Sequence, residues 1–332
     1  MFWCLTIALA LSLAGGARAG VNQWTIIGPP LEVRTMAIDP DDADTLYTAG
    51  FDQVARSTDR GATWTLRAVP GMGAAVAIRV SESISSTVYV LSSSGLYRST
   101  NGGDSWTARK VPTSGQFPQD LQIDGRNSNI LVLSAWNFCF FGCTGGGVYR
   151  SEDGGGSWKR IGFKDENATS VALDPISTQI LYAISEKRLF TTRDGGRSWT
   201  VITPEEGGDP RGVVVDPVIA TTIYAATDGG VFRSDDSGHS WSLVRQSFGA
   251  TLARPASRSR EIFATAAGAV RSANQGAAWR ELSTRTSGFI FSSLWELAFS
   301  ADTYYMVTDL QTRPGQILVY ELRQPRSRAV RP

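Results

Sequence analysis

Histidine, and a charge excess of either sign, are nearly missing from this chain of 332 residues. The only histidine is His239, so a Ser-His-Asp triad has no base and a histidine-rich metal site has no ligand set. The 32 Lys and Arg residues balance 31 Asp and Glu residues, which gives a formal net charge of +1. This balance indicates neither a nucleic-acid partner nor an anionic membrane surface. We therefore expect no metal, no cofactor and no bound nucleic acid.

Long apolar runs are also missing, except near the N-terminus. The run over residues 5–14 is too short to span a bilayer, and it is followed by small residues that end at Ala19. This order is typical of a signal peptide, although no Lys or Arg precedes the run. The sequence therefore predicts a signal peptide over residues 1–19, cleavage before Gly20, no membrane span, and a secreted or periplasmic protein.

Cysteine is scarce, and one of the three cysteines lies inside the predicted signal peptide. The other two, Cys139 and Cys143, lie in the run NFCFFGCTGGG. In an oxidising compartment two cysteines at this spacing can close a small disulfide loop, and free thiols are the alternative. Two thiols without a nearby histidine give too few ligands for a metal site. We predict the disulfide.

A repeated octapeptide that ends in tryptophan is what the chain has in abundance. Its copies read STDRGATW, STNGGDSW, SEDGGGSW, TRDGGRSW, SDDSGHSW and SANQGAAW, and they lie 38 to 52 residues apart. Two other signatures precede each copy at a steady offset. One is an apolar strand that ends in Asp-Pro or a related pair, such as MAIDP, and the other is a β-branched and aromatic strand, such as TLYTAG. Each of these occurs seven times, so the sequence contains seven repeat units.

Each unit predicts four short strands, the third entering the octapeptide and the fourth beginning at its tryptophan. The seventh unit lacks an octapeptide, and the segment NQWTIIGPP from Asn22 resembles the missing fourth strand. We therefore predict an all-β chain, a single seven-bladed β-propeller of four-stranded antiparallel blades over residues 20–322. The N-terminal strand would close the ring in the last blade. The Arg-rich end over residues 323–332 is predicted to be a disordered, solvated tail, with an interaction tail as the alternative.

The octapeptide resembles the Asp-box, or BNR repeat, of sialidases, sortilin-type receptor domains, xyloglucan-degrading propellers and photosystem II assembly factors of the Ycf48 type. These families share little else, so the resemblance implies the propeller and not one activity. We expect the Asp or Asn to hold a tight turn and the Trp to pack on the turn and the neighbouring sheet. Asn in two copies suits a hydrogen-bonding role better than a metal role. The predicted structural residues are Asp59, Trp64, Asn101, Trp106, Asp153, Trp158, Asp194, Trp199, Asp236, Trp241, Asn274 and Trp279.

Strand order separates the two faces of the predicted ring. The Asp-Pro turns and the octapeptides share one face, so we expect ligands on the other. The most unusual loop of that other face covers residues 134–147, with the sequence SAWNFCFFGCTGGG. Its rings can form a sugar-stacking or protein-binding platform, or a hydrophobic plug over the central channel. The aromatic candidates are Trp136, Phe138, Phe140 and Phe141.

Charged residues on the connecting loops give further candidates for ligand contact, namely Arg34, Asp120 and Arg211. Carboxylates around the axis can serve as general acid and base in glycoside cleavage, and otherwise they are ordinary solvated charges. The segment EVRTM around Arg34 lacks the Ile and Pro of the sialidase motif. Xyloglucan-cleaving relatives commonly use two tandem propellers, whereas this chain predicts one.

These observations favour an exported, non-catalytic and monomeric Asp-box propeller that binds a protein partner or a glycan. The binding residues would lie on the face that carries the aromatic loop. The alternative is a glycoside hydrolase of the sialidase or xyloglucanase type that uses the loop carboxylates.

Overall fold

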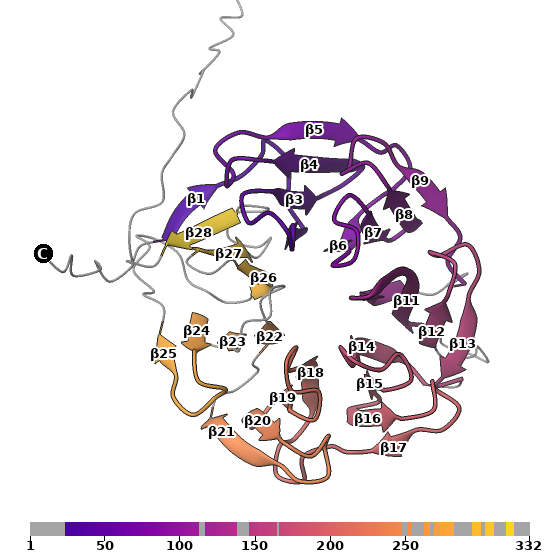
Figure 1. Ribbon diagram of the computed structural model, residues 1–332, viewed down its shortest axis with the longest axis vertical. Helices are drawn as coiled ribbons and strands as arrows, with labels where there is room; N and C mark the ends of the chain where they lie inside the picture. The colour runs from indigo at the N-terminus through magenta and orange to yellow at the C-terminus, as the bar shows by residue number, and fades with distance from the viewer. Residues whose placement is uncertain are drawn as a thin grey trace, which may run out of the picture.

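The described residues of this computed structural model form short strands joined by turns and loops, and no helix occurs among them. The strands form seven sheets of four antiparallel strands. The sheets stand around a central axis as the blades of a propeller (Figure 1). The structure describes residues 24–112, 117–137, 146–164, 166–246, 251–253, 262–265, 269–281, 294–299, 303–308 and 317–321.

Blades 1 to 6 each run in chain order from the strand nearest the axis to the outermost strand. Blade 1 holds β2 (Thr35–Ile38), β3 (Leu46–Ala49), β4 (Gln53–Ser57) and β5 (Thr65–Ala68). Blade 2 holds β6 (Ala75–Val80), β7 (Val88–Ser92), β8 (Gly95–Ser99) and β9 (Thr107–Arg109). Blade 3 holds β10 (Phe117–Asp124), β11 (Asn127–Trp136), β12 (Gly147–Ser151) and β13 (Lys159–Gly162).

The next three blades repeat the same order. Blade 4 holds β14 (Ala168–Leu173), β15 (Leu181–Ser185), β16 (Arg188–Thr192) and β17 (Thr200–Val201). Blade 5 holds β18 (Pro210–Val215), β19 (Ile223–Thr227), β20 (Gly230–Ser234) and β21 (Ser242–Gln246). Blade 6 holds β22 (Thr251–Ala253), β23 (Ile262–Thr265), β24 (Ala269–Ser272) and β25 (Arg280–Glu281).

The seventh blade combines strands from both ends of the described chain. Its three inner strands are β26 (Leu294–Phe299), β27 (Thr303–Thr308) and β28 (Ile317–Glu321). The N-terminal strand β1 (Trp24–Ile27) pairs antiparallel with β28, so that Ile27 lies opposite Ile317. The first strand of the chain therefore supplies the outer strand that the last repeat lacks, which is the pairing that the sequence predicts.

The hydrophobic core lies between neighbouring sheets. The β-branched and apolar second strands β3, β7, β15 and β19 are buried along their whole length. One buried cluster joins Leu91 of blade 2 to Leu133 of blade 3, and another joins Val132 of blade 3 to Val171 of blade 4. Each blade thus buries its two faces against its neighbours, as expected for a repeat whose units cannot form a core alone.

The two faces of the ring are built from different connections. On the first, the octapeptide turn bonds back to the turn between strands one and two, for example from Gly102 N to Ser86 O at 2.8 Å and from Ser237 N to Thr221 O at 2.9 Å. We call this the Asp-box face. On the opposite side, which we call the loop face, Asp52 N donates to Gly73 O at 3.1 Å and so links the strand-two to strand-three loop to the next blade.

Candidate functional site

The Asp-box turns show what the repeated acidic residue does. In blade 3, Asp153 Oδ1 accepts hydrogen bonds from Ser157 N at 2.9 Å and Ser151 Oγ at 2.8 Å, and its Oδ2 accepts one from Ser157 Oγ at 2.7 Å. Ser151 Oγ in turn accepts the amide of Gly155 at 2.8 Å, whose φ of 86° suits glycine. The same pattern recurs at Asp59, Asp194 and Asp236.

These contacts also lower the pKa values of the turn carboxylates. The hydrogen bonds from the side chain and the amide of Ser157, with that from Ser151, lower the pKa of Asp153 to about 2. Asn101 and Asn274 keep the accepting oxygen, because Ser105 N and Ala278 N donate to it at 3.0 and 2.8 Å. Across the described ranges, no group of three or more His, Cys, Asp or Glu residues is placed to hold a metal ion.

The six octapeptide tryptophans are half-buried, and each packs against a cluster of buried hydrophobic residues. Four of them donate the indole N–H to the preceding blade. These bonds run from Trp158 to Lys110 O at 2.8 Å, from Trp199 to Ile161 O at 2.9 Å, from Trp241 to Ile202 O at 2.7 Å and from Trp279 to Val244 O at 3.1 Å. Trp64 and Trp106 donate instead to Gly61 O and Gly103 O of their own turns. The ring therefore links blades as well as bracing its turn.

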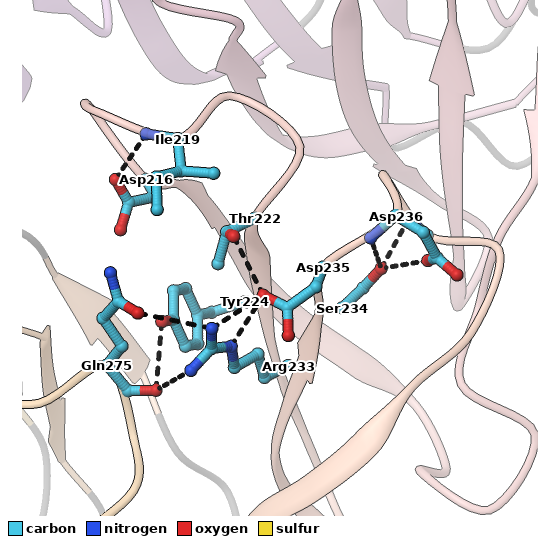
Figure 2. Close-up of polar contacts among 10 residues, drawn as sticks. Asp216, Ile219, Thr222, Tyr224, Arg233, Ser234, Asp235, Asp236 and Gln275 are labelled. Carbon is cyan, nitrogen blue, oxygen red and sulfur yellow. Dashed lines mark hydrogen bonds and ion pairs between the residues drawn. The ribbon is translucent and has the colours of Figure 1, made fainter.

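An arginine in the third strand forms a further link on the Asp-box face that the sequence analysis missed. Figure 2 shows Arg233 of β20 between Asp235 of its own blade and Gln275 of the next. Its NH1 donates to Gln275 O at 2.8 Å, and the guanidinium carbon lies 6.0 Å from the centroid of the Tyr224 ring. The signal was available, because Arg directly precedes the first residue of most octapeptides.

On the loop face, Trp136 lies at the end of β11 and has 39% of its surface exposed. Phe117, at the start of β10, is directly opposite Trp136 in the ladder and is 54% exposed. Opposed residues of an antiparallel pair project to the same side of the sheet, so blade 3 presents two neighbouring aromatic side chains. Phe117 was not among the sequence candidates. Phe138, Phe140, Phe141, Cys139 and Cys143 lie outside the described residues.

Asn167, just before β14, holds the two ends of the connection between β11 and β12. Its Oδ1 accepts hydrogen bonds from Asn137 N at 2.7 Å and from Gly146 N at 3.1 Å, the two residues that flank the connection between β11 and β12. The amide of Asn167 donates to Glu186 Oε1 at 3.2 Å. Blade 4 therefore holds both ends of the β11–β12 connection of blade 3 through one side chain.

Asp120 lies in β10 and joins three blades. Its Oδ1 pairs with Arg79 NH2 of blade 2 at 3.3 Å, and its Oδ2 accepts the amide of Val171 of blade 4 at 3.3 Å. Its side chain is only 17% exposed. These contacts make Asp120 a link between blades next to the axis.

The two arginine candidates lie on other blades. Arg34 precedes β2 and pairs with Glu32 at 3.4 Å. Arg211 of β18 pairs with Asp228 at 2.5 Å, and this contact raises the pKa of the arginine. Arg34, Asp120 and Arg211 thus belong to blades 1, 3 and 5, and each has its own nearby partner.

Comparison with known proteins supports the propeller fold. The Sortilin-Vps10 family model (sortilin, neurotensin receptor 3) matches residues 52–161. No curated protein sequence matches. The structure titled "YCF48 bound to D1 peptide" superposes with a TM-score of 0.66 at 16% identity, covering 92% of this chain and 96% of that one. The chain has the Ycf48 propeller fold.

Two further solved structures are similar. Ycf48 from Cyanidioschyzon merolae gives a TM-score of 0.64 at 16% identity, over 90% of this chain and 98% of that one. The glycoside hydrolase GH74 of Niastella koreensis gives a TM-score of 0.40 at 17% identity, over 84% of this chain and 62% of that one. No helix of the described segments is long and apolar enough to cross a membrane.

Proposed function

We propose that this chain is an exported, non-catalytic propeller that binds a segment of a protein partner on the loop face of blades 3 and 4. The observation that carries the proposal is the pair of exposed aromatic side chains, Phe117 and Trp136, at the end of the β10–β11 ladder, beside the β11–β12 connection whose two ends Asn167 holds. Exposed aromatic rings on a rigid support are efficient contacts for a partner, because they bury much apolar area at little entropic cost.

The likeness to a Ycf48 structure described as bound to a peptide supports a protein partner, since the two chains share their fold over nearly their whole lengths. Export is supported by the apolar run and the small residues before Gly20. Sequencing the N-terminus of the protein recovered from its native host tests export. A chain that begins at Gly20 supports it, and one that still begins at Met1 contradicts it.

The state of the loop-face carboxylates favours binding over glycoside cleavage. Cleavage needs one protonated carboxyl group and one ionised carboxylate about 5 to 9.5 Å apart across the sugar. Asp120 is paired with Arg79, Asp209 with Lys187 at 2.8 Å, and Asp228 with Arg211. Each of these three carboxylates is thus engaged by a cation of the protein and is less free to act on a sugar.

Arrays of immobilised peptides and of glycans test the proposal when they are probed with the mature protein. We expect a subset of peptides to bind the wild type, and Trp136→Ala to weaken that binding about tenfold. Ile176→Ala is the matched control, because Ile176 is 62% exposed on the Asp-box face. Binding only to glycans, or equal loss in both variants, would contradict the proposal. Release of sugar from a bound glycan that Asp209→Asn abolishes would establish the hydrolase instead.

A further inference from the structure

The third-strand arginine has a carboxylate partner in two of the blades. In blade 5, Nε and NH2 of Arg233 donate to Asp235 Oδ1 at 2.9 and 2.7 Å (Figure 2). In blade 3, Nε of Arg150 donates to Glu152 Oε1 at 3.1 Å. In both cases the carboxylate belongs to the second residue of the octapeptide. In both blades, therefore, a carboxylate at this position accepts a hydrogen bond from the arginine.

Blades 1 and 2 keep the arginine and lack the carboxylate. The second octapeptide residue is Thr58 in blade 1 and Thr100 in blade 2. Arg56 stacks on Tyr47 with its guanidinium carbon 5.7 Å from the ring centroid, as Arg233 stacks on Tyr224. Its Nε is buried and has no hydrogen-bond partner among the described residues. A buried donor without an acceptor is unfavourable, so the site in blade 1 lacks an acceptor that blade 5 contains.

A cavity of about 140 Å³ lies beside Arg56, at the junction of blades 1 and 2. Arg67 shares it, and the single carboxylate that lines it is Asp104, which lies 3.4 Å from Arg67. The side chains of Arg67 and Asp104 are 45% and 59% exposed, so this ion pair is weak. Two guanidinium groups therefore face one carboxylate, and the cavity has a net positive charge. Its lining is Val54, Arg56, Thr58, Thr63, Thr65, Arg67, Gly103 and Asp104.

We propose that this cavity is a carboxylate-binding site that takes the side chain of a Glu or Asp residue from an acidic peptide segment. The bound carboxylate would pair with the guanidinium of Arg56, the role that Asp235 has beside Arg233, and Arg67 would supply further donors. The site belongs to the Asp-box face, so it is separate from the loop-face binding proposed above and does not depend on it.

Two substitutions test the site in opposite ways. Arg56→Gln removes the cation. Thr58→Asp places a carboxylate in blade 1 at the position that Asp235 has in blade 5. This carboxylate would pair with Arg56 and so compete with the carboxylate of the peptide. The control is Thr200→Asp, which adds the same charge in blade 4. Thr200 is exposed and lies opposite Thr191, which stands in blade 4 where other blades have the third-strand arginine.

The probe is an acetylated and amidated tetraglutamate peptide, with tetraglutamine as its neutral counterpart, and binding to the full mature chain is measured by calorimetry. We expect wild type and Thr200→Asp to bind tetraglutamate alike, and Arg56→Gln and Thr58→Asp to bind it at least about tenfold more weakly. Thr58→Asp should also raise the melting temperature, which shows that it folds. Equal binding by Thr58→Asp and wild type, equal binding of the two peptides, or no binding by wild type at millimolar peptide would overturn the proposal.

Discussion

At the scale of single residues, Asp153 shows how one carboxylate of the repeat satisfies several donors at once. Its two oxygens accept an amide and two hydroxyl groups from neighbouring turn residues. A carboxylate that is fully used in this way is a structural group, because it has little capacity left for a ligand. The same holds for Asp59, Asp194 and Asp236.

Acid should therefore weaken the fold through the Asp-box turns. The folded pKa of Asp153, about 2, lies below the ordinary value of an aspartate, and the pKa values of Asp194 and Asp236 are also lowered. The stabilisation is present above the unfolded pKa and is lost as the pH falls through the folded pKa. The test is the triple variant Asp153→Asn, Asp194→Asn, Asp236→Asn. Between about pH 4.5 and pH 2, we expect its free energy of unfolding to fall less than that of the wild type, because it has no carboxylate to protonate at these three turns. Denaturant titrations across this range measure it, and parallel curves would contradict the account.

The tryptophan that ends each octapeptide should contribute by packing and by one hydrogen bond. Trp199 is half-buried against Phe163, with ring centroids 4.9 Å apart, and donates to Ile161 O. We expect Trp199→Ala to lower the free energy of unfolding by about 2 kcal/mol, less than a fully buried ring would lose. Trp199→Phe keeps most of the packing and should lose about 1 kcal/mol. Denaturant unfolding measures both losses. Equal losses in the two variants would contradict a stabilising contribution from the packing of the ring.

Sequence reasoning works well for residues whose role is local. The contacts of Asp153 and Gly155 follow from the turn itself, so their pattern in the octapeptide was sufficient to predict the turn. The partners of Arg233 and Asp120 come from neighbouring blades, and no spacing in the sequence shows that Gln275 or Val171 lies beside them. The sequence has Thr58 where blade 5 has Asp235, but it does not show that this position lies beside the third-strand arginine.

At the scale of elements, the β10–β11 hairpin departs most from the repeat. Its strands are eight and ten residues long, whereas the corresponding β18 and β19 of blade 5 have six and five. The extra length carries Phe117 and Trp136 at its end, and Asn167 of blade 4 holds the two residues that flank the next connection, from β11 to β12. The sequence showed the long connection, but the aromatic partner across the ladder and the asparagine on the next blade depend on strand register and packing.

Removing the Asn167 side chain should loosen the two ends of the connection between β11 and β12. Asn167→Ala takes away the acceptor of the amides of Asn137 and Gly146, and we expect both amides to exchange with deuterium about tenfold faster. Exchange at residue resolution by NMR measures the effect. Asn129→Ala, on the opposite face of the same blade, is the control and should leave both rates unchanged. Unchanged exchange in Asn167→Ala would remove the basis for a rigid support.

At the scale of the whole molecule, the pairing of β1 with β28 joins the ends of the ring. Deleting residues 20–29 should leave β28 as an exposed edge and abolish cooperative unfolding. A peptide of residues 22–29 added in trans should restore a single transition, and a scrambled peptide should not. A deleted chain that melts as sharply and at the same temperature as the full mature chain would contradict this role of β1.

In this account the loop face of blades 3 and 4 binds a segment of a protein partner, and the cavity at blades 1 and 2 on the Asp-box face is a separate site. The most direct test is the dissociation constant of an array-selected peptide for the Phe117→Ala, Trp136→Ala double variant. We expect it to rise at least about thirtyfold while the melting temperature stays that of the wild type, because both rings are exposed at the end of their hairpin. An unchanged dissociation constant would contradict the assignment of binding to this face.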